Sequence, residues 1–323
     1  MESLPWWVHG FTVIATILVV GKGAHWIVEG AARLSARLGI SELVVGLTVV
    51  AFGTSAPEFA VTLLAAFRDQ GDISVGNIVG SNIFNLGFIL GGCAAVRAIP
   101  ISPTFLWRDV AFVAGGTILL SLQIGWGLRL TRGEGTLLLF LLFAYLLYLF
   151  QRRSMRPEGV AVAGELALGT RSRSILGEVK VLALGLVCVV GGSHLLVDSA
   201  SALAGAFGMS EWVIGVTIVA AGTSAPEFAT SLVGVLKGRY ALSAGNLIGS
   251  DIFNLFGVLG VAGMLRPLEV DPAARVSLAA LSAMVFMVLV MMRSSWRISR
   301  AEGLVLVTVA LARWGLDFSA QAP

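Results

Sequence analysis

Two glutamates, Glu58 and Glu227, occupy the same place in a hexapeptide that occurs twice in this chain. The hexapeptide is Gly-Thr-Ser-Ala-Pro-Glu, at residues 53–58 and 222–227, and each copy lies inside a long apolar stretch. A carboxylate surrounded by hydrocarbon is costly unless a partner or a cation compensates its charge. Two carboxylates in matched apolar settings therefore predict one shared cation site.

The same hexapeptides offer further oxygen atoms. Pro57 and Pro226 have no N–H, so each leaves a backbone carbonyl about one turn upstream, near Gly53 or Gly222, without its helical donor. Such backbone is tolerated at membrane depth where it lines a cavity or meets other partners. Hydroxyl groups come from Thr54, Ser55, Thr223 and Ser224. The hexapeptides thus predict broken helices that present carbonyl, hydroxyl and carboxylate oxygens together.

A second segment follows each hexapeptide, at residues 76–85 and 245–254. In each copy a serine and an asparagine are four residues apart and share one helix face. They are Ser81 with Asn85, and Ser250 with Asn254. Hard cations take oxygen ligands, and calcium accepts about six to eight of them. Neither motif holds a cysteine or a histidine, which argues against zinc or copper.

The second segment can also be interpreted as a packing face. Its glycines have the small-xxx-small spacing that lets helices approach closely. They are Gly76, Gly80, Gly245 and Gly249. Because a glutamate-bearing helix break accompanies both copies, we favour the cation site and expect close packing as a second use of the glycines.

The elements that position these residues must lie in a membrane. Of the 323 residues, 57% are hydrophobic and 13% are charged, whereas a soluble globular protein carries about 25% charged residues. An apolar stretch of about 20 residues suffices to span a bilayer. We predict an all-α polytopic membrane protein with ten transmembrane helices. The expected spans are residues 10–34, 42–67, 73–96, 108–124, 136–150, 179–203, 211–236, 242–264, 273–292 and 302–316.

The two halves of the chain repeat each other. Residues 38–91 align with 207–260 without a gap at a constant offset of 169, so each residue has a counterpart 169 positions away. We expect a first five-helix repeat at 1–150, a polar linker at 151–177 and a second five-helix repeat at 178–323. Five spans per half is an odd number, so the second repeat must enter the membrane from the opposite side. Inverted repeats are typical of secondary transporters, whose substrate site lies where the repeats meet.

The positive charges predict the orientation in the membrane. The loops that hold Arg33, Arg97 and the linker arginines are richer in positive charge than the alternate loops, as cytoplasmic loops usually are. We expect a multi-pass protein of the cell membrane with a cytoplasmic linker and both termini outside. The expected partners are the transported ions and the lipid bilayer, with no nucleic acid and no obligate protein partner.

The two motif blocks resemble the paired alpha-repeats of the sodium/calcium exchanger family, in its prokaryotic form, within the calcium/cation antiporter superfamily. The resemblance covers about residues 20–96 and 190–264 by motif. It implies a transporter and not an enzyme, without a cofactor, in which Ca2+ and Na+ occupy four adjacent central sites in turn. It also implies that the first and sixth helices slide as a pair across the rest of the protein.

The resemblance also implies a ligand set. In the first repeat the matching residues are Glu58, Thr54, Ser55, Ser81, Asn85 and the carbonyl of Ala51. In the second repeat they are Glu227, Thr223, Ser224, Ser250 and the carbonyl of Ala220. Asn254 stands where some members carry an aspartate. Potassium-dependent relatives typically have an acid there, so we expect exchange without potassium.

The neutral side chain of Asn254 also sets the charge of the centre. Glu58, Glu227, Asn85 and Asn254 together carry about two negative charges if both glutamates ionise. One calcium ion balances that charge, whereas three sodium ions, the number expected from the family, exceed it by one. Exchange is therefore expected to be electrogenic.

Asp251 departs from the repeat, because its counterpart is Asn82. We interpret Asp251 as a partnered carboxylate at a helix–helix contact. The alternative is that Asp251 faces the cation site as an additional ligand, where protons would compete with the cations.

The remaining histidines and cysteines carry little chemistry in this interpretation. His25 and His194 are counterparts, near Glu29 and Asp198. We favour a structural His–acid pair over a proton relay. Cys93 and Cys188 lie in apolar segments and are expected to be packing residues, without a disulfide.

Other functions stay open from the sequence. A proton-coupled exchanger of calcium or another divalent cation is the first alternative, and a cation channel lined by oxygens is another. An intramembrane hydrolase would use Ser55 or Ser224 as nucleophile and would need a base within hydrogen-bond reach. No histidine is near either serine in the sequence.

Overall fold

The computed structural model describes residues 5–151, 174–207 and 220–320, which are helical apart from short connections and four two-residue strands. The first half contains α1 (Trp6–Leu38), α2 (Glu42–Val45), η1 (Gly46–Val50), α3 (Ala51–Thr54), α4 (Ala56–Phe67), α5 (Gly71–Phe84), η2 (Asn85–Ile89), α6 (Leu90–Val96), η3 (Phe105–Val110), α7 (Ala111–Gly127) and α8 (Arg132–Gln151). The second half contains α10 (Ile175–Ala206), α12 (Ala220–Thr223), α13 (Ala225–Leu236), α14 (Tyr240–Ile252), η5 (Phe253–Val258), α15 (Leu259–Leu265), α16 (Ala274–Ser295) and α17 (Arg300–Ala320). The segments labelled η are π-helical turns within longer helices.

The predicted all-helical fold is confirmed. Seven described helices are long and apolar enough to cross a membrane, or eight if the bent pair Glu42–Thr54 and Ala56–Phe67 counts as one span. α13 is a shorter apolar helix, and residues 211–219 of the predicted seventh span lie outside the described residues. The count of ten spans therefore stays a prediction. Most of the predicted linker also lies outside the described residues.

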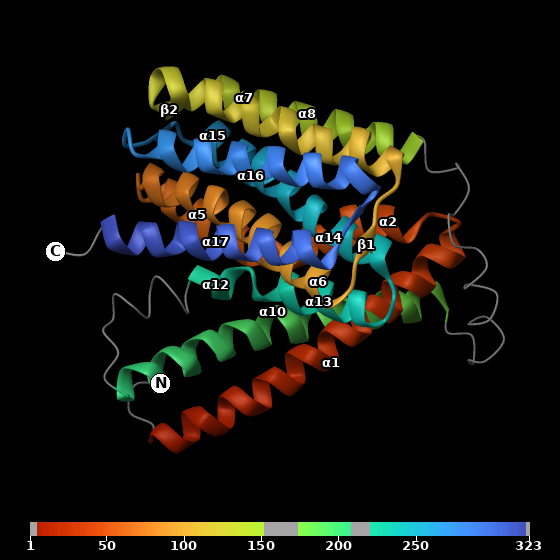
Figure 1. Ribbon diagram of the computed structural model, residues 1–323. Coiled ribbons are helices and arrows are strands. Elements are labelled where there is room, and N and C mark those ends of the chain that lie inside the picture. Colours follow the sequence, from red (N-terminus) through yellow and green to blue (C-terminus); the bar gives the residue numbers. More distant parts are fainter. Residues whose placement is uncertain (1–4, 152–173, 208–219, 321–323) are drawn as a thin grey trace.

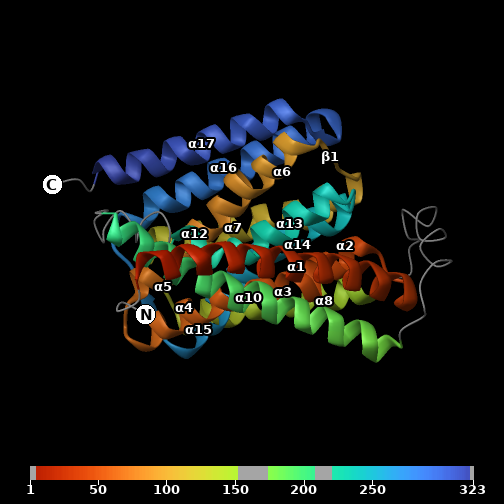
Figure 2. The same ribbon diagram turned by 90° about the horizontal axis from the view of Figure 1, so that it is seen from below.

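The helices form one main bundle with two helices laid against its side. In Figures 1 and 2, α1 and α10 lie next to each other along one flank of the bundle. The main hydrophobic core is built from the remaining helices, whereas the second core cluster joins α1 and α10 to a few residues of α2, η1 and α14. The α1/α10 pair is thus packed largely on itself. Cys93 is buried and Cys188 half-buried, and both are free thiols as predicted.

Two short antiparallel ladders join the halves of the chain. β1 (Ile99–Pro100) pairs with β4 (Arg297–Ile298), and β2 (Arg129–Leu130) pairs with β3 (Leu268–Glu269). Ile99 and Leu268 are counterparts, and each pairs with a strand of the other half. The ladders therefore relate the two halves in the same reciprocal way as the sequence repeat does.

The glycines of the second motif segment behave differently in the two repeats. A Cβ built on Gly245 would lie 2.7 Å from the Leu43 carbonyl oxygen, and one on Gly249 would lie 2.7 Å from the Ala51 Cβ. A Cβ on Gly76 or Gly80 would meet no described atom within 4 Å. The predicted close packing is therefore confirmed for the second repeat. For the first repeat it stays a prediction, because the counterparts of Leu43 and Leu47, at positions 212 and 216, lie outside the described residues.

This difference predicts unequal costs for one substitution at counterpart positions. Gly249→Ala should destabilise the protein by about 1–3 kcal/mol, because the new methyl group overpacks against backbone atoms of η1. Gly80→Ala should be neutral or slightly stabilising, since alanine favours a helix over glycine by up to about 1 kcal/mol. Melting temperatures in detergent would measure both variants. Equal melting temperatures for the two variants would contradict the asymmetric packing.

Candidate cation site

The first repeat places Glu58 at a helix break. α3 ends at Thr54 and α4 begins at Ala56, and the two helical segments are bent by 50° at Ser55. Pro57 lies in the first turn of α4, where a missing N–H is tolerated. Glu58 follows in the same turn and is 1% exposed. The positive end of the α4 dipole stabilises a negative charge at this position.

The second repeat forms the same break. α12 ends at Thr223 and α13 begins at Ala225, with Ser224 between them in a backbone conformation close to that of Ser55. Glu227 lies in the first turn of α13 and is fully buried. The helix breaks that the prolines predict are thus confirmed in both repeats.

Each glutamate is bonded by the serine of the opposite repeat. The Ser224 hydroxyl donates to Glu58 Oε1 at 3.2 Å, and the Ser55 hydroxyl donates to Glu227 Oε1 at 3.2 Å. Ser250 also donates to Glu227 Oε1, at 3.4 Å. Each carboxylate thus lies within hydrogen-bond reach of the serine that stands three residues before the other glutamate. The structure therefore brings the paired carboxylates together, as the repeated hexapeptide predicts.

Five oxygen atoms of this region are buried and accept no hydrogen bond from the part of the chain that the structure describes. They are Glu58 Oε2, Glu227 Oε2, Asn85 Oδ1, Asn254 Oδ1 and Asp251 Oδ2. All five are acceptors, and buried acceptors without a donor are rare in folded proteins. A cation satisfies acceptors without needing a donor, and hard cations prefer this type of oxygen. This set of five oxygen atoms therefore fits a calcium or sodium ion.

The asparagines of the second segment form a reciprocal pair of bonds between the repeats. Asn85 Nδ2 donates to Asp251 Oδ1 at 3.0 Å, and Asn254 Nδ2 donates to Asn82 Oδ1 at 3.0 Å. Each amide thereby keeps its own Oδ1 free of hydrogen bonds. Asp251 lies at the contact of α5 with α14 and also experiences the charge of Glu227. It therefore has a partner at a helix contact and borders the site as well.

The two asparagines that open the second segment support the site from behind. Asn77 Nδ2 donates to Thr62 Oγ1, and Asn246 Nδ2 donates to Ser231 Oγ, each at 3.0 Å. Asn246 Oδ1 accepts from the Thr54 hydroxyl at 3.2 Å. Sequence reasoning did not select these asparagines, although both lie in the repeated segment with a polar side chain between apolar neighbours.

The remaining predicted ligands differ in burial and in hydrogen bonding. The Ala51 carbonyl accepts the Ser55 N–H at 3.0 Å and the Thr54 hydroxyl at 3.3 Å. Thr223 is half-buried, and its hydroxyl forms no hydrogen bond within the described residues. Ala220 begins α12, but its side chain is outside the described set. The first-repeat ligands are therefore better defined than those of α12.

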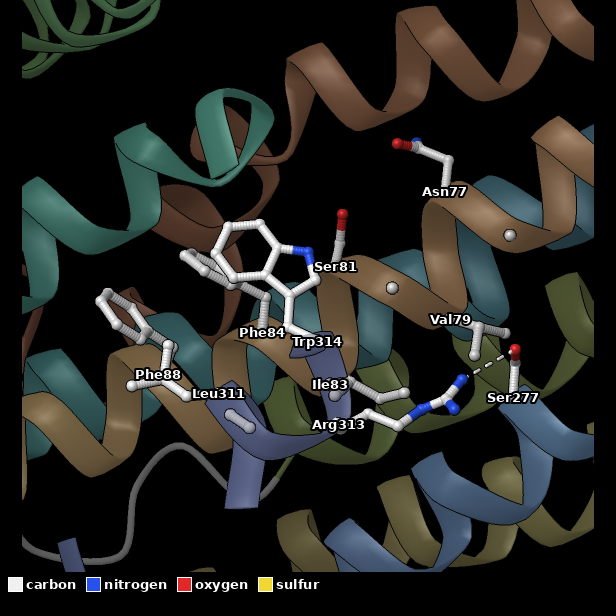
Figure 3. A pocket seen from close by; sticks show the side chains of 13 residues that line it. Asn77, Val79, Ser81, Ile83, Phe84, Phe88, Ser277, Leu311, Arg313 and Trp314 are labelled. Atoms are coloured by element: carbon white, nitrogen blue, oxygen red, sulfur yellow. Dashed lines mark hydrogen bonds between the residues drawn. The ribbon is translucent and has the colours of Figure 1, made fainter. Parts of the chain in front are cut away.

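A cavity of about 280 Å³ adjoins the site between α5, η2, α16 and α17. Figure 3 shows Asn77 and Ser81 projecting from the same side of α5 at this cavity. Ser81 also interacts with the Glu58 carboxylate. Aromatic rings and one arginine complete the lining, which includes Phe84, Phe88, Trp314 and Arg313. Through Ser81, the cavity borders the candidate cation site.

Two alternative chemistries find no support in the described residues. The hydroxyls of Ser55 and Ser224 donate to carboxylates, and no histidine contacts either serine in the described part of the chain. No group of three or more His, Cys, Asp or Glu residues suited to a metal occurs there either. Glu29 accepts hydrogen bonds from Arg33 and Lys237, whereas His25 lies nearby without a hydrogen bond to it in the described part of the chain.

Known proteins resemble this chain along most of its length. A family model described as sodium/calcium exchanger protein matches residues 8–151 and 178–312. The putative antiporter CaxA of Alkalimonas amylolytica is 36% identical over 315 residues, covering 96% of this chain and 98% of that protein. The sodium/calcium exchanger MaX1 of Methanosarcina acetivorans is 30% identical, covering 93% of this chain and 97% of that protein.

Solved structures of a sodium-calcium exchanger have a similar fold. A structure of the sodium-calcium exchanger NCX_Mj soaked with Na+ and without Ca2+ superposes with a TM-score of 0.82 at 27% sequence identity. The superposition covers 95% of this chain and 98% of that one. The residues matched by the family model include both helix breaks. This chain therefore belongs to the sodium/calcium exchanger family, whose members are transporters and not enzymes.

Proposed function

We propose that the protein exchanges Na+ for Ca2+ across the membrane by alternating access, electrogenically and without potassium. The observation that carries this proposal is a group of five buried acceptor oxygens that have no hydrogen-bond partner among the described residues. They gather where the serine of each repeat contacts the glutamate of the other. A divalent cation neutralises both carboxylates and uses the free oxygens. Glu58, Glu227, Asn85 and Asn254 are the central ligands, and Thr54, Ser55, Ser81, Ser224 and Ser250 support them with hydroxyls. Thr223 and the carbonyls of Ala51 and Ala220 complete the proposed set.

The proposed topology is two inverted five-helix repeats with both termini outside and the linker cytoplasmic. Reciprocal bonds between counterpart residues and reciprocal strand pairs support the inversion. In Figure 1, α1 begins and α17 ends at the same end of the bundle, which agrees with both termini on one side. The richer positive charge of the linker side supports its cytoplasmic placement.

Proton coupling is the second candidate, and Asp251 is the observation that favours it. Asp251 is fully buried beside the site, and its Oδ2 accepts no hydrogen bond. A third buried carboxylate raises the negative charge above that of the two glutamates, and a proton can compensate the excess as sodium can.

Calcium uptake into proteoliposomes separates these candidates. Vesicles loaded with sodium and diluted into sodium-free buffer should accumulate radioactive calcium, and an inside-negative potential created by sodium exit should follow. Replacing the sodium gradient by a pH gradient should abolish uptake, and adding potassium should leave it unchanged. Uptake driven by the pH gradient alone would instead establish the proton-coupled exchanger. Calcium uptake that needs neither a sodium gradient nor a pH gradient would contradict exchange.

A further inference from the structure

The helices α1 and α10 pack closely against each other. A Cβ on Gly23 would lie 2.8 Å from the Cys188 Cβ, and a Cβ on Gly185 would lie 2.9 Å from the Gly23 carbonyl oxygen. The two helices therefore touch backbone to backbone. Their shared apolar cluster is separate from the main core. Each helix of the pair packs more extensively on the other than on any described helix of the bundle.

The position of this pair breaks the symmetry of the repeats. A Cβ on Gly53 would lie 2.6 Å from Leu186, and one on Gly222 would lie 2.2 Å from Val197, both on α10. In a symmetric arrangement, one of these two glycines would face α1. Likewise, α1 packs along α13, whereas its counterpart contact between α10 and α4 is marginal in the described residues. The pair is therefore displaced toward one end of the bundle.

At that end an ion pair fastens α1 to the bundle. Glu29 of α1 accepts from Lys237 Nζ at 2.5 Å, and Lys237 is the residue that ends α13. Arg33 bonds both Glu29 and Glu178, so the ion pair is connected to α10 as well. Lys237 and Glu29 are 25% and 27% exposed, so the pair is partly solvated.

The counterparts of this ion pair carry the same charges. Lys237 corresponds to Arg68, at the end of α4, and Glu29 corresponds to Asp198 on α10. Arg68 and Asp198 are both exposed, and neither forms an ion pair among the described residues. The repeat thus holds two matched acid–base pairs, of which one is formed and the other is open.

We propose that Glu29–Lys237 and Arg68–Asp198 are alternating latches, one formed in each of the two access states. This inference rests on the proposed alternating access. If every contact of the α1/α10 pair is replaced by the contact between the counterpart residues, 169 positions away, the second access state results. In that state α10 is bound to α4 by Arg68–Asp198, and α1 no longer contacts α13 through Glu29–Lys237. The two ion pairs set which side of the cation site is closed, and they act as positioning residues for transport.

The expected size of each latch follows from its exposure. Ion pairs near the surface stabilise by up to about 1 kcal/mol, and this partly buried pair falls in the upper half of that range, about 0.5–1 kcal/mol. Breaking one latch should therefore shift the ratio of the two states by about two- to fivefold. Such a shift leaves both states populated. The ion pairs therefore change the populations of the two access states without preventing the transition between them.

Cysteine cross-linking tests the proposal directly. In a Cys93→Ala, Cys188→Ala background, a short bis-thiol reagent would be applied to the pair Arg68→Cys with Asp198→Cys. Adding Glu29→Gln should speed this cross-link two- to fivefold, because the formed latch is broken. The reverse arm uses Glu29→Cys with Lys237→Cys, and there Asp198→Asn should speed the cross-link. Glu302→Gln, in a capping box at the start of α17, is the matched control and should change neither rate.

Each outcome is decisive. A cross-link between positions 68 and 198 that forms at the same rate with and without Glu29→Gln would overturn the coupling. Absence of that cross-link in a protein that still transports calcium would overturn the second latch. Cross-linking needs no ion gradient, so alternating latches in a protein that fails sodium-driven uptake would reject the proposed coupling ion and keep the latches. As a second variant, Glu29→Lys with Lys237→Glu should restore the original cross-linking rate.

Discussion

Replacing Glu58 by Gln, or Glu227 by Gln, should lower calcium transport at least about 100-fold and leave the protein folded. Each variant removes one of the two charges that compensate a divalent cation, an interaction on the order of 3 kcal/mol or more in a buried setting. The glutamine keeps one oxygen that can accept from Ser224 or Ser55, so the helix break should persist. Radioactive calcium uptake into proteoliposomes would measure the loss.

A binding readout keeps this prediction independent of transport. Calcium should raise the melting temperature of the unaltered protein, because a ligand that binds the folded state stabilises it, and this increase should vanish in both variants. Glu134→Gln is the matched control, since Glu134 caps the start of α8 through Thr131 and glutamine preserves such a cap. Full uptake by either site variant would remove that glutamate from the ligand set.

Asp251 gives the second large effect. Asp251→Ala should lower calcium transport at least tenfold, whereas Asp251→Asn should stay within about threefold of the unaltered protein. Alanine leaves the buried Asn85 amide without an acceptor, a loss of about 1–3 kcal/mol, and frees its Oδ1 to turn away. Asparagine still accepts from Asn85 and reproduces the amide–amide pair that Asn254 forms with Asn82. Uptake rates at fixed sodium and calcium gradients would compare the two variants.

The chain contains its own control for this comparison. Asn82→Ala removes the equivalent acceptor from Asn254 and should cause a loss similar to that of Asp251→Ala. A loss of tenfold or more in Asp251→Asn would show that the charge of Asp251, and not its hydrogen bond, is required. That result would favour a third negative charge in the cation site and would strengthen the proton-coupled alternative.

The helix breaks and the apolar helices could be predicted from the sequence, because both depend on residues that are close together in the chain. A proline inside an apolar helical stretch removes a backbone hydrogen bond and breaks or kinks the helix, so Pro57 and Pro226 predict both breaks. Hydropathy placed the described helices correctly but made most of them short. The first predicted span, residues 10–34, became α1 from Trp6 to Leu38, because a helix continues into the polar membrane interface beyond its last apolar residue.

The features that sequence reasoning missed depend on contacts between distant segments. The bond from Thr54 to Asn246 spans 192 positions, and the ion pair of Glu29 with Lys237 spans 208. No local rule predicts either. The π-helical turns that contain Asn85 and Asn254 were also missed, because one extra residue in a turn leaves the apolar pattern nearly unchanged. Such turns are frequent at functional sites.

The serine bonds across the repeats have a consequence for the origin of this architecture. The Ser55 hydroxyl donates to Glu227 and the Ser224 hydroxyl donates to Glu58, so each glutamate depends on a residue of the other repeat. A gene encoding a single repeat could build this site only as a homodimer, with each subunit lending its serine to the glutamate of the other. Fusion of two such genes would keep every bond and free each copy to diverge, as Asp251 has done from Asn82.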